Sequence, residues 1–364
     1  MFRRINVSRR ACITTCVAGL TAALFGGLGI RPRFRGRWCV ARSAKQIQGS
    51  SASDRHRFAR PGAVCCLVLG DWGSGLPLQR EVAEGMQQFA SVEHPQFIIS
   101  TGDNFYPSGV ESIDDPAWRD KFENVYNGHD LRLPWYSTLG NHDHQGAIDP
   151  QIEYGRVNPR WNMPAPWYAF TRTCGDVRVD FFTLDTESFA VGDMPQMSQQ
   201  IAWLDSALAK STADWKLCVG HHPLRSHGHY GSTPRLVEFV KPLLDRHGVA
   251  AYVCGHDHDL QLVKADDDRF CCVVSGAGGK ARDALIGDDT VFADTNGGFA
   301  ALSFTKTEMG VAFVDADGSP SWIERFLKWP TMGAAENEEE FICQRQSLLA
   351  SENQSSSSLP IGQS

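Results

Sequence analysis

Acidic residues are almost missing from the first 60 positions of this 364-residue chain. Asp54 is the single acid there, whereas 13 of the 35 Lys and Arg residues fall in the same stretch. The remaining chain therefore holds 22 basic and 41 acidic residues, a formal balance of −19. A body with this charge repels polyanions, so we expect no nucleic-acid partner, although it can hold cations.

The chain also has no Cys-x-x-Cys pair and no internal repeat, which argues against a structural zinc site of that type and against a repeat architecture. Its eleven cysteines do not have the spacing of a disulfide framework. Cys65, Cys66, Cys254, Cys271 and Cys272 lie inside apolar runs, where a thiol behaves as a small buried hydrophobic group. Cysteine usage therefore leaves the redox compartment open.

Long hydrophobic runs are scarce as well. The run Ala11–Ile30 is near membrane-spanning length, but it contains four Gly and three Thr and lies between arginine clusters. We predict that residues 1–60 are a targeting segment, a signal sequence or signal anchor, which directs the protein to the secretory pathway, the cell exterior or an organelle lumen. A twin-arginine export signal, a plastid or other organellar transit peptide and a membrane anchor are the alternatives, with membrane contact expected only through residues 11–30.

The body is predicted to span residues 61–333, and residues 334–364 form a polar, serine-rich tail that is predicted to be disordered. Within the body, short apolar runs bounded by Gly, Asp or His predict buried strands that alternate with helices. This mixture of βαβ units and hairpins predicts an α/β fold with mixed sheets and helices outside. Strands are predicted at Val64–Leu69, Phe97–Ser100, Trp135–Leu139, Val179–Leu184, Trp215–Val219 and Val249–Cys254, helices at Gln79–Ala90, Gln199–Lys210 and Pro234–His247, a hairpin at Tyr168–Leu184, and a meander from Phe270–Ser275, Phe299–Phe304 and Val311–Val314.

Five polar blocks follow apolar runs of the body. A single Gly-Asp or Gly-His has little meaning, but five such blocks in order bring together carboxylates, an amide, a phenol and several imidazoles. In open α/β sheets, loops beyond the carboxyl ends of strands form the binding site. The blocks are Gly70-Asp71-Trp72-Gly73, Gly102-Asp103-Asn104-Phe105-Tyr106, Gly140-Asn141-His142-Asp143, Gly220-His221-His222 and Gly255-His256-Asp257-His258.

These donors are numerous enough for two adjacent metal ions. Carboxylate, imidazole and amide groups suit borderline or hard ions, and a phenolate such as Tyr106 suits Fe(III). Two ions about 3.5–4 Å apart can clamp a phosphate and activate a water molecule. Singly, each Asp or Asn is explained by strand-end turns, but capping requires neither the His256-x-His258 pair nor this order of blocks.

The blocks, together with Arg160–Tyr168 and Leu184–Thr186, resemble the purple acid phosphatases, especially the small tartrate-resistant type, within the calcineurin-like metallophosphoesterases. The resemblance extends from about Val64 to Val314. It implies a sandwich of two mixed β-sheets flanked by helices. It also implies a dinuclear acid phosphatase that hydrolyses small phosphate monoesters by attack of a metal-bound hydroxide, with no covalent phosphoenzyme.

The resemblance also implies a role for each residue of the blocks. One group binds a ferric ion at the first site, a second group binds a divalent ion (iron, zinc or manganese), one carboxylate bridges the two ions, and one histidine faces the substrate phosphate and the leaving group. The first group is Asp71, Tyr106 and His258, the second is Asn141, His221 and His256, the bridge is Asp103, and the histidine is His142.

One stretch, Ser226–Gly231, departs from the family pattern. His229 is our candidate for the family's substrate-facing histidine there, and Tyr230 stands at the position that this histidine usually has. We therefore expect His142 or His229 to protonate the leaving oxygen. The cysteine pair of the mammalian-type enzymes has no counterpart, and Ser188–Gln199 is shorter than their restraining loop.

Two other functions stay open at this level. The same centre could hydrolyse phosphodiesters or nucleotides, and a relative without catalysis could act as a binding protein. The complete set of donors argues against the latter. For the remaining polar residues we expect a structural His222, solvated His144, His227 and His247, Asp143 and Asp257 orienting the neighbouring ligands, and Trp72 in either the pocket or the core.

Overall fold

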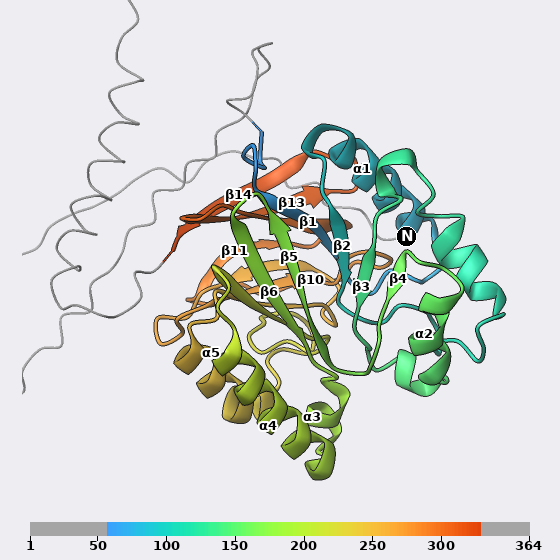
Figure 1. The fold of residues 1–364 in the computed structure, drawn as a ribbon. Coiled ribbons are helices and arrows are strands. Elements are labelled where there is room, and N and C mark those ends of the chain that lie inside the picture. Colours follow the sequence, from blue (N-terminus) through green and yellow to red (C-terminus); the bar gives the residue numbers. More distant parts are fainter. Residues whose placement is uncertain (1–56, 329–364) are drawn as a thin grey trace, which may run out of the picture. The chain divides into compact units, whose positions relative to one another are not determined.

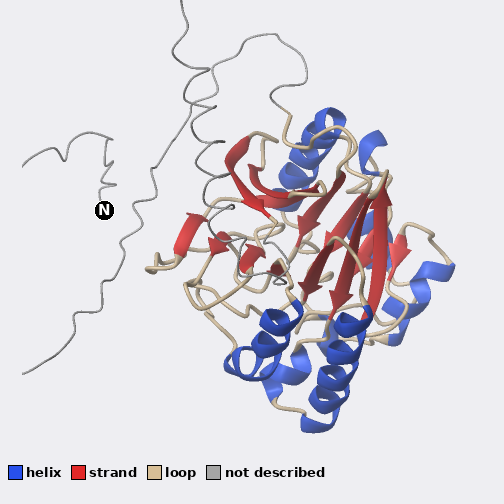
Figure 2. Cartoon of the chain, turned by 60° about the vertical axis from the view of Figure 1, so that its left-hand side comes forward, coloured by secondary structure: helices blue, strands red, loops and turns tan. Residues whose placement is uncertain are grey.

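The computed structural model describes residues 57–328, which form two seven-stranded mixed β-sheets with helices on their outer sides. Figure 1 shows α1 outside the sheet that contains β1–β4, and α3, α4 and α5 outside the sheet that contains β5–β10. Figure 2 shows the strands enclosed between two sets of helices. The predicted α/β sandwich is confirmed.

The first sheet has the strand order β14-β13-β12-β1-β2-β3-β4. Strands β1 to β4 run parallel to one another. Strand β12 pairs with β1 in the antiparallel sense and leads into an antiparallel meander. Its strands are β1 (Val64–Leu69), β2 (Phe97–Ser100), β3 (Trp135–Ser137), β4 (Trp161–Asn162), β12 (Gly298–Phe304), β13 (Glu308–Asp315) and β14 (Pro320–Leu327).

The second sheet has the order β11-β9-β10-β8-β7-β6-β5. Its central strands β6, β7, β8 and β10 run parallel, and β5, β9 and β11 are antiparallel to their partners. Its strands are β5 (Tyr168–Cys174), β6 (Val177–Thr183), β7 (Trp215–Val219), β8 (Ala251–Cys254), β9 (Leu260–Val263), β10 (Cys271–Ser275) and β11 (Thr290–Asp294).

The helices cover the sheets through apolar faces. In α1 the buried residues include Val82, Met86 and Phe89, at the spacing of one helical face. The helices are α1 (Pro77–Glu93), α2 (Asp149–Glu153), α3 (Glu187–Val191), α4 (Met194–Lys210) and α5 (Lys241–His247), with short 3₁₀ or π turns at Trp118–Glu123, His129–Leu131, Asp143–Gln145, Tyr154–Arg156 and Leu236–Val240.

Alternate side chains of β1 point to opposite faces of the sheet, so this one strand contributes to two hydrophobic cores. Cys65 and Leu67 belong to the outer core beneath α1, whereas Val64 and Cys66 belong to the core between the sheets. A third core lies between the second sheet and helices α4 and α5. Because both faces of the central strands are buried, they are almost continuously apolar, as parallel strands usually are.

Most predicted elements are present, with three instructive differences. The predicted helix Pro234–His247 is divided, because Pro242 has no N–H to continue the hydrogen-bond ladder and a π turn precedes it. The hairpin is present, but its loop is only Gly175-Asp176, with Gly175 at φ 58°. The predicted meander is divided between the sheets, since β10 joins the second sheet and β12–β14 form the meander.

The folded body begins before the predicted boundary at residue 61. Phe58 is 1% exposed and its ring lies 6.2 Å from that of Phe89, while the backbone N–H groups of Phe58 and Ala59 donate to the Glu93 carboxylate. The predicted targeting segment otherwise lies outside the described residues, as do the run Ala11–Ile30 and the tail 334–364. Among the residues described, no helix combines the length and apolarity needed to cross a bilayer.

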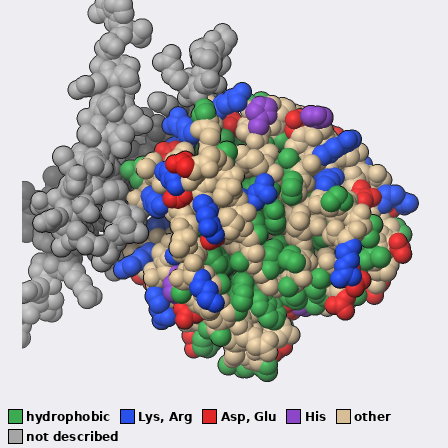
Figure 3. Space-filling view, viewed as in Figure 1, with side chains coloured by type: hydrophobic (Ala, Val, Ile, Leu, Met, Phe, Trp, Pro, Cys, Tyr) green, Lys and Arg blue, Asp and Glu red, His purple; other side chains and the backbone are tan. Residues whose placement is uncertain are grey.

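The cysteines of the described body are reduced. Cys65, Cys66, Cys254, Cys271 and Cys272 are buried in strands β1, β8 and β10, as predicted. Burial raises the pKa of the Cys65 thiol to about 12, so it stays protonated. On the face seen in Figure 1, basic side chains are spread among acidic, apolar and other groups rather than gathered in one field (Figure 3).

Candidate metal centre

The five predicted blocks meet at one edge of the sandwich. Asp71 and Asp103 follow β1 and β2, and His221 and His256 follow β7 and β8. The backbone N–H of His256 donates to Asp71 Oδ2 at 2.9 Å, across 185 positions of sequence. The carboxyl ends of parallel strands from both sheets therefore build one site, as the strand-end positions of the blocks predicted.

The first group of donors surrounds the hydroxyl of Tyr106. This oxygen lies 3.0 Å from Asp71 Oδ1, 2.8 Å from Asp103 Oδ2 and 3.2 Å from His258 Nε2. His258 Nε2 is also 3.4 Å from Asp71 Oδ1. The hydroxyl has one hydrogen, so it donates to only one of these neighbours, and the group gathers oxygen and nitrogen atoms that can bind a cation.

The second group surrounds His221 Nε2. This nitrogen lies 3.2 Å from Asn141 Oδ1, 3.2 Å from His256 Nδ1 and 3.5 Å from Asp103 Oδ1. His221 Nδ1 donates to the Thr101 carbonyl at 2.9 Å, because a carbonyl can only accept. In neutral His221 the Nε2 lone pair therefore faces other lone pairs, an arrangement that a cation stabilises.

Asp103 joins the two groups. Its Oδ2 faces Tyr106 and its Oδ1 faces His221, so one carboxylate presents an oxygen to each side. Donor atoms bound about 2.0–2.2 Å from one ion are separated by about 3 Å, which matches the spacing within both groups. The buried atoms of Asp71, Asp103 and His221 also lie within 4.8 Å of one another. The donor set therefore fits two metal ions with Asp103 between them.

The buried carboxylates of the site favour a bound cation. Burial raises the pKa of Asp71 well above its usual range, and the neighbouring Asp103 raises it further, although His221 opposes this. Burial lowers the pKa of His221, but Asp103 and Asp71 outweigh this effect and raise it. Burial and the same two carboxylates raise the pKa of Tyr106, so its hydroxyl is protonated until a cation reverses that balance.

Glycine makes the close approach of these blocks possible. A Cβ at Gly140 would lie 2.2 Å from Asp103 Oδ1, and a Cβ at Gly255 would lie 2.4 Å from Asp71 Oδ2. Three of the donor residues have a left-handed backbone, with φ of 57° at Asp71, 50° at Asp103 and 67° at His256. Non-glycine residues rarely adopt this conformation, and its recurrence here is typical of functional sites.

A second layer of carboxylates holds the loops. Asp143 is fully buried and accepts from the backbone N–H groups of Gly140 and Asn104 at 2.9 and 3.1 Å. Asp257 accepts from the Ser226 hydroxyl at 2.5 Å and from the Tyr230 N–H at 2.7 Å. We expected both to orient neighbouring ligands, but in the structure their direct contacts are to loop backbone and to hydroxyl and amide groups.

His142 stands at the mouth of the centre. Its Nδ1 donates to the Pro107 carbonyl at 2.5 Å, its ring lies 4.4 Å from that of Tyr106, and its Nε2 is 4.0 Å from Asp103 Oδ2. It lines a cavity of about 160 Å³ beside the donors. The other lining residues are Asp103, Asn141, Tyr230, His256, His258, Lys280 and Arg282.

The structure does not bring His229 into this cavity. His229 is exposed, and Tyr230 occupies the wall instead, with its ring 4.3 Å from that of His256. Lys280 and Arg282 also line the wall, although no sequence pattern had pointed to them. They follow β10 in an irregular segment without a block of the Gly-Asp or Gly-His kind, so only their place after a buried strand could have drawn attention to them.

The remaining polar residues have structural partners. Three histidines expected to be solvated are instead paired with carboxylates: His144 with Asp185 at 2.9 Å, His227 with Asp289 at 2.5 Å and His247 with Asp205 at 2.6 Å. His222 is structural as predicted, since it is buried and hydrogen-bonded to the Thr186 hydroxyl at 2.9 Å. Trp72 is in the core, fully buried, with its indole N–H donating to Ser100 Oγ at 2.9 Å.

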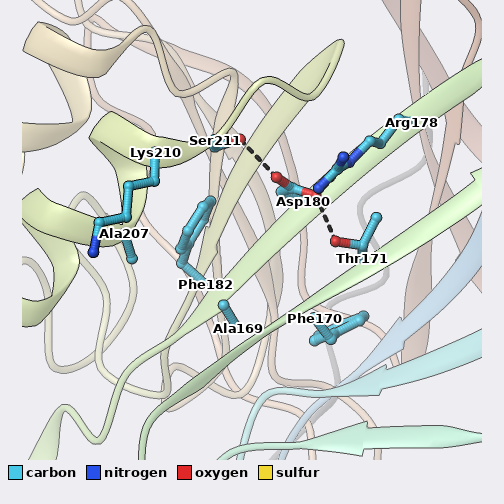
Figure 4. Close-up of a pocket in the computed structure, with 9 residues that line it drawn as sticks. All are labelled: Ala169, Phe170, Thr171, Arg178, Asp180, Phe182, Ala207, Lys210 and Ser211. Atoms are coloured by element: carbon cyan, nitrogen blue, oxygen red, sulfur yellow. Dashed lines mark hydrogen bonds and ion pairs between the residues drawn. The ribbon is translucent and has the colours of Figure 1, made fainter.

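A larger cavity, of about 240 Å³, lies elsewhere, between β5, β6 and the end of α4. Figure 4 shows Asp180 at its centre, bonded to Thr171 and Ser211. This carboxylate accepts from Thr171 Oγ1 at 2.7 Å, Ser211 Oγ at 2.6 Å and Arg178 Nε at 3.3 Å. Each of these contacts has its own proton, and the lining of this cavity contains no second carboxylate and no imidazole.

Comparison with known proteins identifies the family. Residues 66–260 match the calcineurin-like phosphoesterase family. Human tartrate-resistant acid phosphatase type 5 is 35% identical over 289 residues, which is 70% of this chain and 88% of the human protein. The chain is a calcineurin-like metallophosphoesterase of the purple acid phosphatase family. Purple acid phosphatase 3 of Arabidopsis thaliana is 33% identical to this chain over 298 residues, which is 74% of this chain and 80% of the plant protein.

Solved structures share the fold of this chain. GAP50, described as the anchor in the inner membrane complex of Plasmodium, has a TM-score of 0.68 at 25% identity, covering 74% of this chain and 90% of its own. The purple acid phosphatase PPD1 of yellow lupin has a TM-score of 0.55 at 16% identity, covering 75% and 57%. The lupin protein has the same fold as this chain.

Proposed function

We propose that this protein is an acid phosphatase that hydrolyses small phosphate monoesters at a dinuclear metal centre. The observation that carries the proposal is Asp103, whose two oxygens face two separate groups of donors. Each group gathers carboxylate, amide or imidazole atoms of the kind that a metal ion binds. The family membership and the cavity beside the donors support the same activity.

The residues available suit two different ions. We propose that Asp71, Tyr106 and His258 hold Fe(III) at the first site, because a phenol oxygen favours the ferric ion. Asn141, His221 and His256 have amide and imidazole donors, which suit a divalent iron, zinc or manganese ion. When bound, the pair of ions supplies a nucleophilic water at acidic pH and neutralises charge on the phosphate.

The protein's own side chains would position the ester and supply a proton to its leaving oxygen. His142 uses its Nδ1 proton on Pro107, so its ring orientation is fixed, and in the imidazolium form its Nε2 proton would pass to the leaving oxygen. Asn141 and Tyr230 form walls that orient the phosphate and its substituent. We place the proton donor at His142 rather than His229, because only His142 lines the cavity.

Two measurements on one preparation test this function. Metal analysis is expected to find two ions per chain, including iron, and the rate on an aryl phosphate is expected to be highest at acidic pH. Protein that holds both metals but hydrolyses no phosphate monoester would overturn the proposal. A preference for a bis-aryl phosphodiester would favour the diesterase alternative instead.

The likeness to GAP50 keeps a binding function open as a second candidate, since that protein is described as an anchor. The targeting signal predicted in residues 1–60 is compatible with either function. We propose that the protein acts in the secretory pathway, outside the cell or in an organelle lumen. Fluorescence microscopy of a tagged full-length chain tests this, and a cytosolic signal would contradict it.

A further inference from the structure

The aromatic ring of Tyr106 has a cation over it. The Lys280 ammonium lies 4.5 Å from the centre of this ring, and Tyr106 is only 5% exposed, so the ring is largely shielded from solvent. The other donors of the first group meet Tyr106 at its hydroxyl oxygen, whereas Lys280 meets it at the ring itself. The phenol is therefore influenced from two directions, through its oxygen and through its π-system.

The segment that carries Lys280 is fixed to the metal-binding blocks. The Gly278 N–H donates to the carbonyl of Gly70 at 3.2 Å, and the Ser74 hydroxyl donates to the Gly279 carbonyl at 3.0 Å. On the other side of Lys280, the Arg282 N–H donates to the carbonyl of His258 at 2.8 Å. Lys280 thus lies between anchored positions, so its place beside Tyr106 is set by the fold.

The charge of Lys280 acts on the first group of donors. The salt bridges found within residues 57–328 do not include Lys280. Burial is the largest cause of the low pKa of His258, about 4, and the positive charges of Arg282 and Lys280 lower this pKa further. No carboxylate of the described body therefore pairs with this ammonium, and its field reaches the site.

Arg282 makes the matching contact with a different ring. Its guanidinium lies 5.4 Å from the centre of the Tyr230 ring and donates to the Tyr230 hydroxyl at 2.9 Å. The Tyr230 ring in turn lies 4.3 Å from that of His256, in the second group of donors. The two cations of the cavity wall therefore face two different aromatic side chains, and only Lys280 lies over a proposed metal ligand.

Elementary electrostatics gives the consequence. A cation over an aromatic ring is attracted to the negative face of its π-system, and the attraction grows when the ring carries phenolate charge. The ammonium lowers the energy of the filled ring orbitals, from which the charge-transfer band of an iron phenolate originates, so the transition requires more energy. The same positive charge favours the less positive oxidation state of a nearby iron ion and so raises its reduction potential.

We propose that Lys280 tunes the first metal site through the ring of Tyr106. Its ammonium holds the charge-transfer band at shorter wavelength, and the reduction potential of the bound iron higher, than they would be without it. This inference rests on the proposed ferric site. It adds a residue outside the five blocks to those that set the properties of the site, and this residue acts without coordinating the ion.

The absorption maximum of the oxidised protein, measured without substrate, tests this role. Metal-free full-length protein is loaded with Fe(III), and the wild type is compared with Lys280→Met and Lys280→Arg. Met keeps much of the length of the side chain and removes its charge, so we expect the maximum to move to longer wavelength by about 10–40 nm. Lys280→Arg keeps the charge and should keep the wild-type maximum. Because a maximum does not depend on the fraction of protein loaded, incomplete loading leaves the comparison valid.

Two further variants separate the position of the charge from its mere presence. Arg282→Met removes a cation from the same wall but from over Tyr230, so its shift should be less than half that of Lys280→Met. Lys280→Gln repeats the loss of charge with a polar side chain and should shift the band in the same direction as Lys280→Met. Redox titration with a one-electron reductant, followed by loss of the band, should give a lower potential for both neutral variants than for the wild type and Lys280→Arg.

The outcomes distinguish this role from the ferric site on which it rests. An unmoved band in Lys280→Met and Lys280→Gln would overturn the role of Lys280 and leave the ferric site intact. Equal shifts in Lys280→Arg or Arg282→Met would also overturn it, because they would indicate a general disturbance of the cavity. A wild type that binds Fe(III) without any visible band would show that Tyr106 is not a ligand, and the role of Lys280 would fall with that assignment.

Discussion

Two cavities within residues 57–328 contain buried carboxylates in different surroundings. At the metal cavity, two carboxylates and an imidazole surround the Tyr106 hydroxyl, and a carboxylate, an amide and an imidazole surround His221 Nε2. At the larger cavity, Asp180 accepts from two hydroxyls and an arginine. Size, burial and the presence of an aspartate therefore do not separate a cation site from a structural carboxylate. The number of carboxylate, amide and imidazole groups gathered around one point does.

The largest expected effect comes from removing the shared carboxylate. Asp103→Ala deprives both groups of a donor, so we expect loss of both metals and activity near background, measured by metal analysis and by the rate on an aryl phosphate. Asp180→Ala is the control. It is expected to keep both metals and the rate while losing about 1–3 kcal/mol of unfolding free energy. Full metal occupancy in Asp103→Ala would refute the bridging role.

The next largest effect is expected for the phenol of Tyr106 in the first group of donors. A phenolate bound to Fe(III) absorbs visible light by charge transfer, so purified oxidised protein should be purple to pink and Tyr106→Phe colourless. Tyr136→Phe, whose ring stacks on Phe170 away from the donors, should keep the colour. Visible spectra of the three proteins decide this. A colourless, iron-free and fully active wild type would eliminate the ferric assignment.

A smaller loss is expected for the proposed proton donor. His142→Ala should keep both metals but lose about 10²–10⁴-fold in rate, with a steeper dependence on the pKa of the leaving group. Good leaving groups depart without help and should be affected least. His247→Ala, which removes a partly buried histidine paired with Asp205 far from the donors in sequence, should change neither quantity. A uniform loss across all leaving groups would assign His142 to phosphate binding alone.

Metal removal measures how much the bound ions stabilise the fold. Ions that bind only the native state stabilise it by about 4 kcal/mol when present at a thousand times their Kd. Chelation should therefore lower the Tm of the wild type and of Asp180→Ala. For Asp103→Ala, we expect chelation to have little effect. An equal shift in all three proteins would mean that the chelator acts elsewhere.

The smallest effect is expected at the departure from the family pattern. His229 is exposed and outside the cavity, so His229→Ala should change the rate by no more than about twofold, as for an ordinary surface substitution. Tyr230→Phe removes the hydroxyl that holds Arg282, so it should have the larger effect. Rates for both variants on one substrate compare them, and the reverse order would restore His229 as the substrate-facing residue.

Much of this arrangement was predictable because it is local or repetitive. The strands β1, β2 and β7 have their predicted bounds, since apolar runs ended by Gly and Asp or His mark both the strand and its functional end. The donor residues were predictable because five short blocks supply them. The order of the strands and the exchange between sheets were less accessible, as β10 illustrates, because pairing is decided by tertiary packing.

The features that the sequence did not predict have no local sequence pattern. Lys280 reaches the cavity from an irregular segment, held there by backbone hydrogen bonds of its neighbours to residues far away in the chain. Phe58 lies at the end of an arginine-rich, acid-poor stretch, and its burial depends on Phe89 and Glu93. The paired His144 and His247 needed carboxylates that are distant in sequence. Such contacts exist only once the chain has folded.

The bond between the N–H of His256 and Asp71 spans 185 positions and ties the end of β8 in one sheet to the end of β1 in the other. We expect a contact of this range to close late, because the entropy of bringing distant segments together must first be met by packing of the intervening strands. Neither group of donors would be complete before that step. We therefore expect the rate of metal uptake during refolding to report the joining of the two sheets, so that bound metal becomes a kinetic marker for completion of the fold.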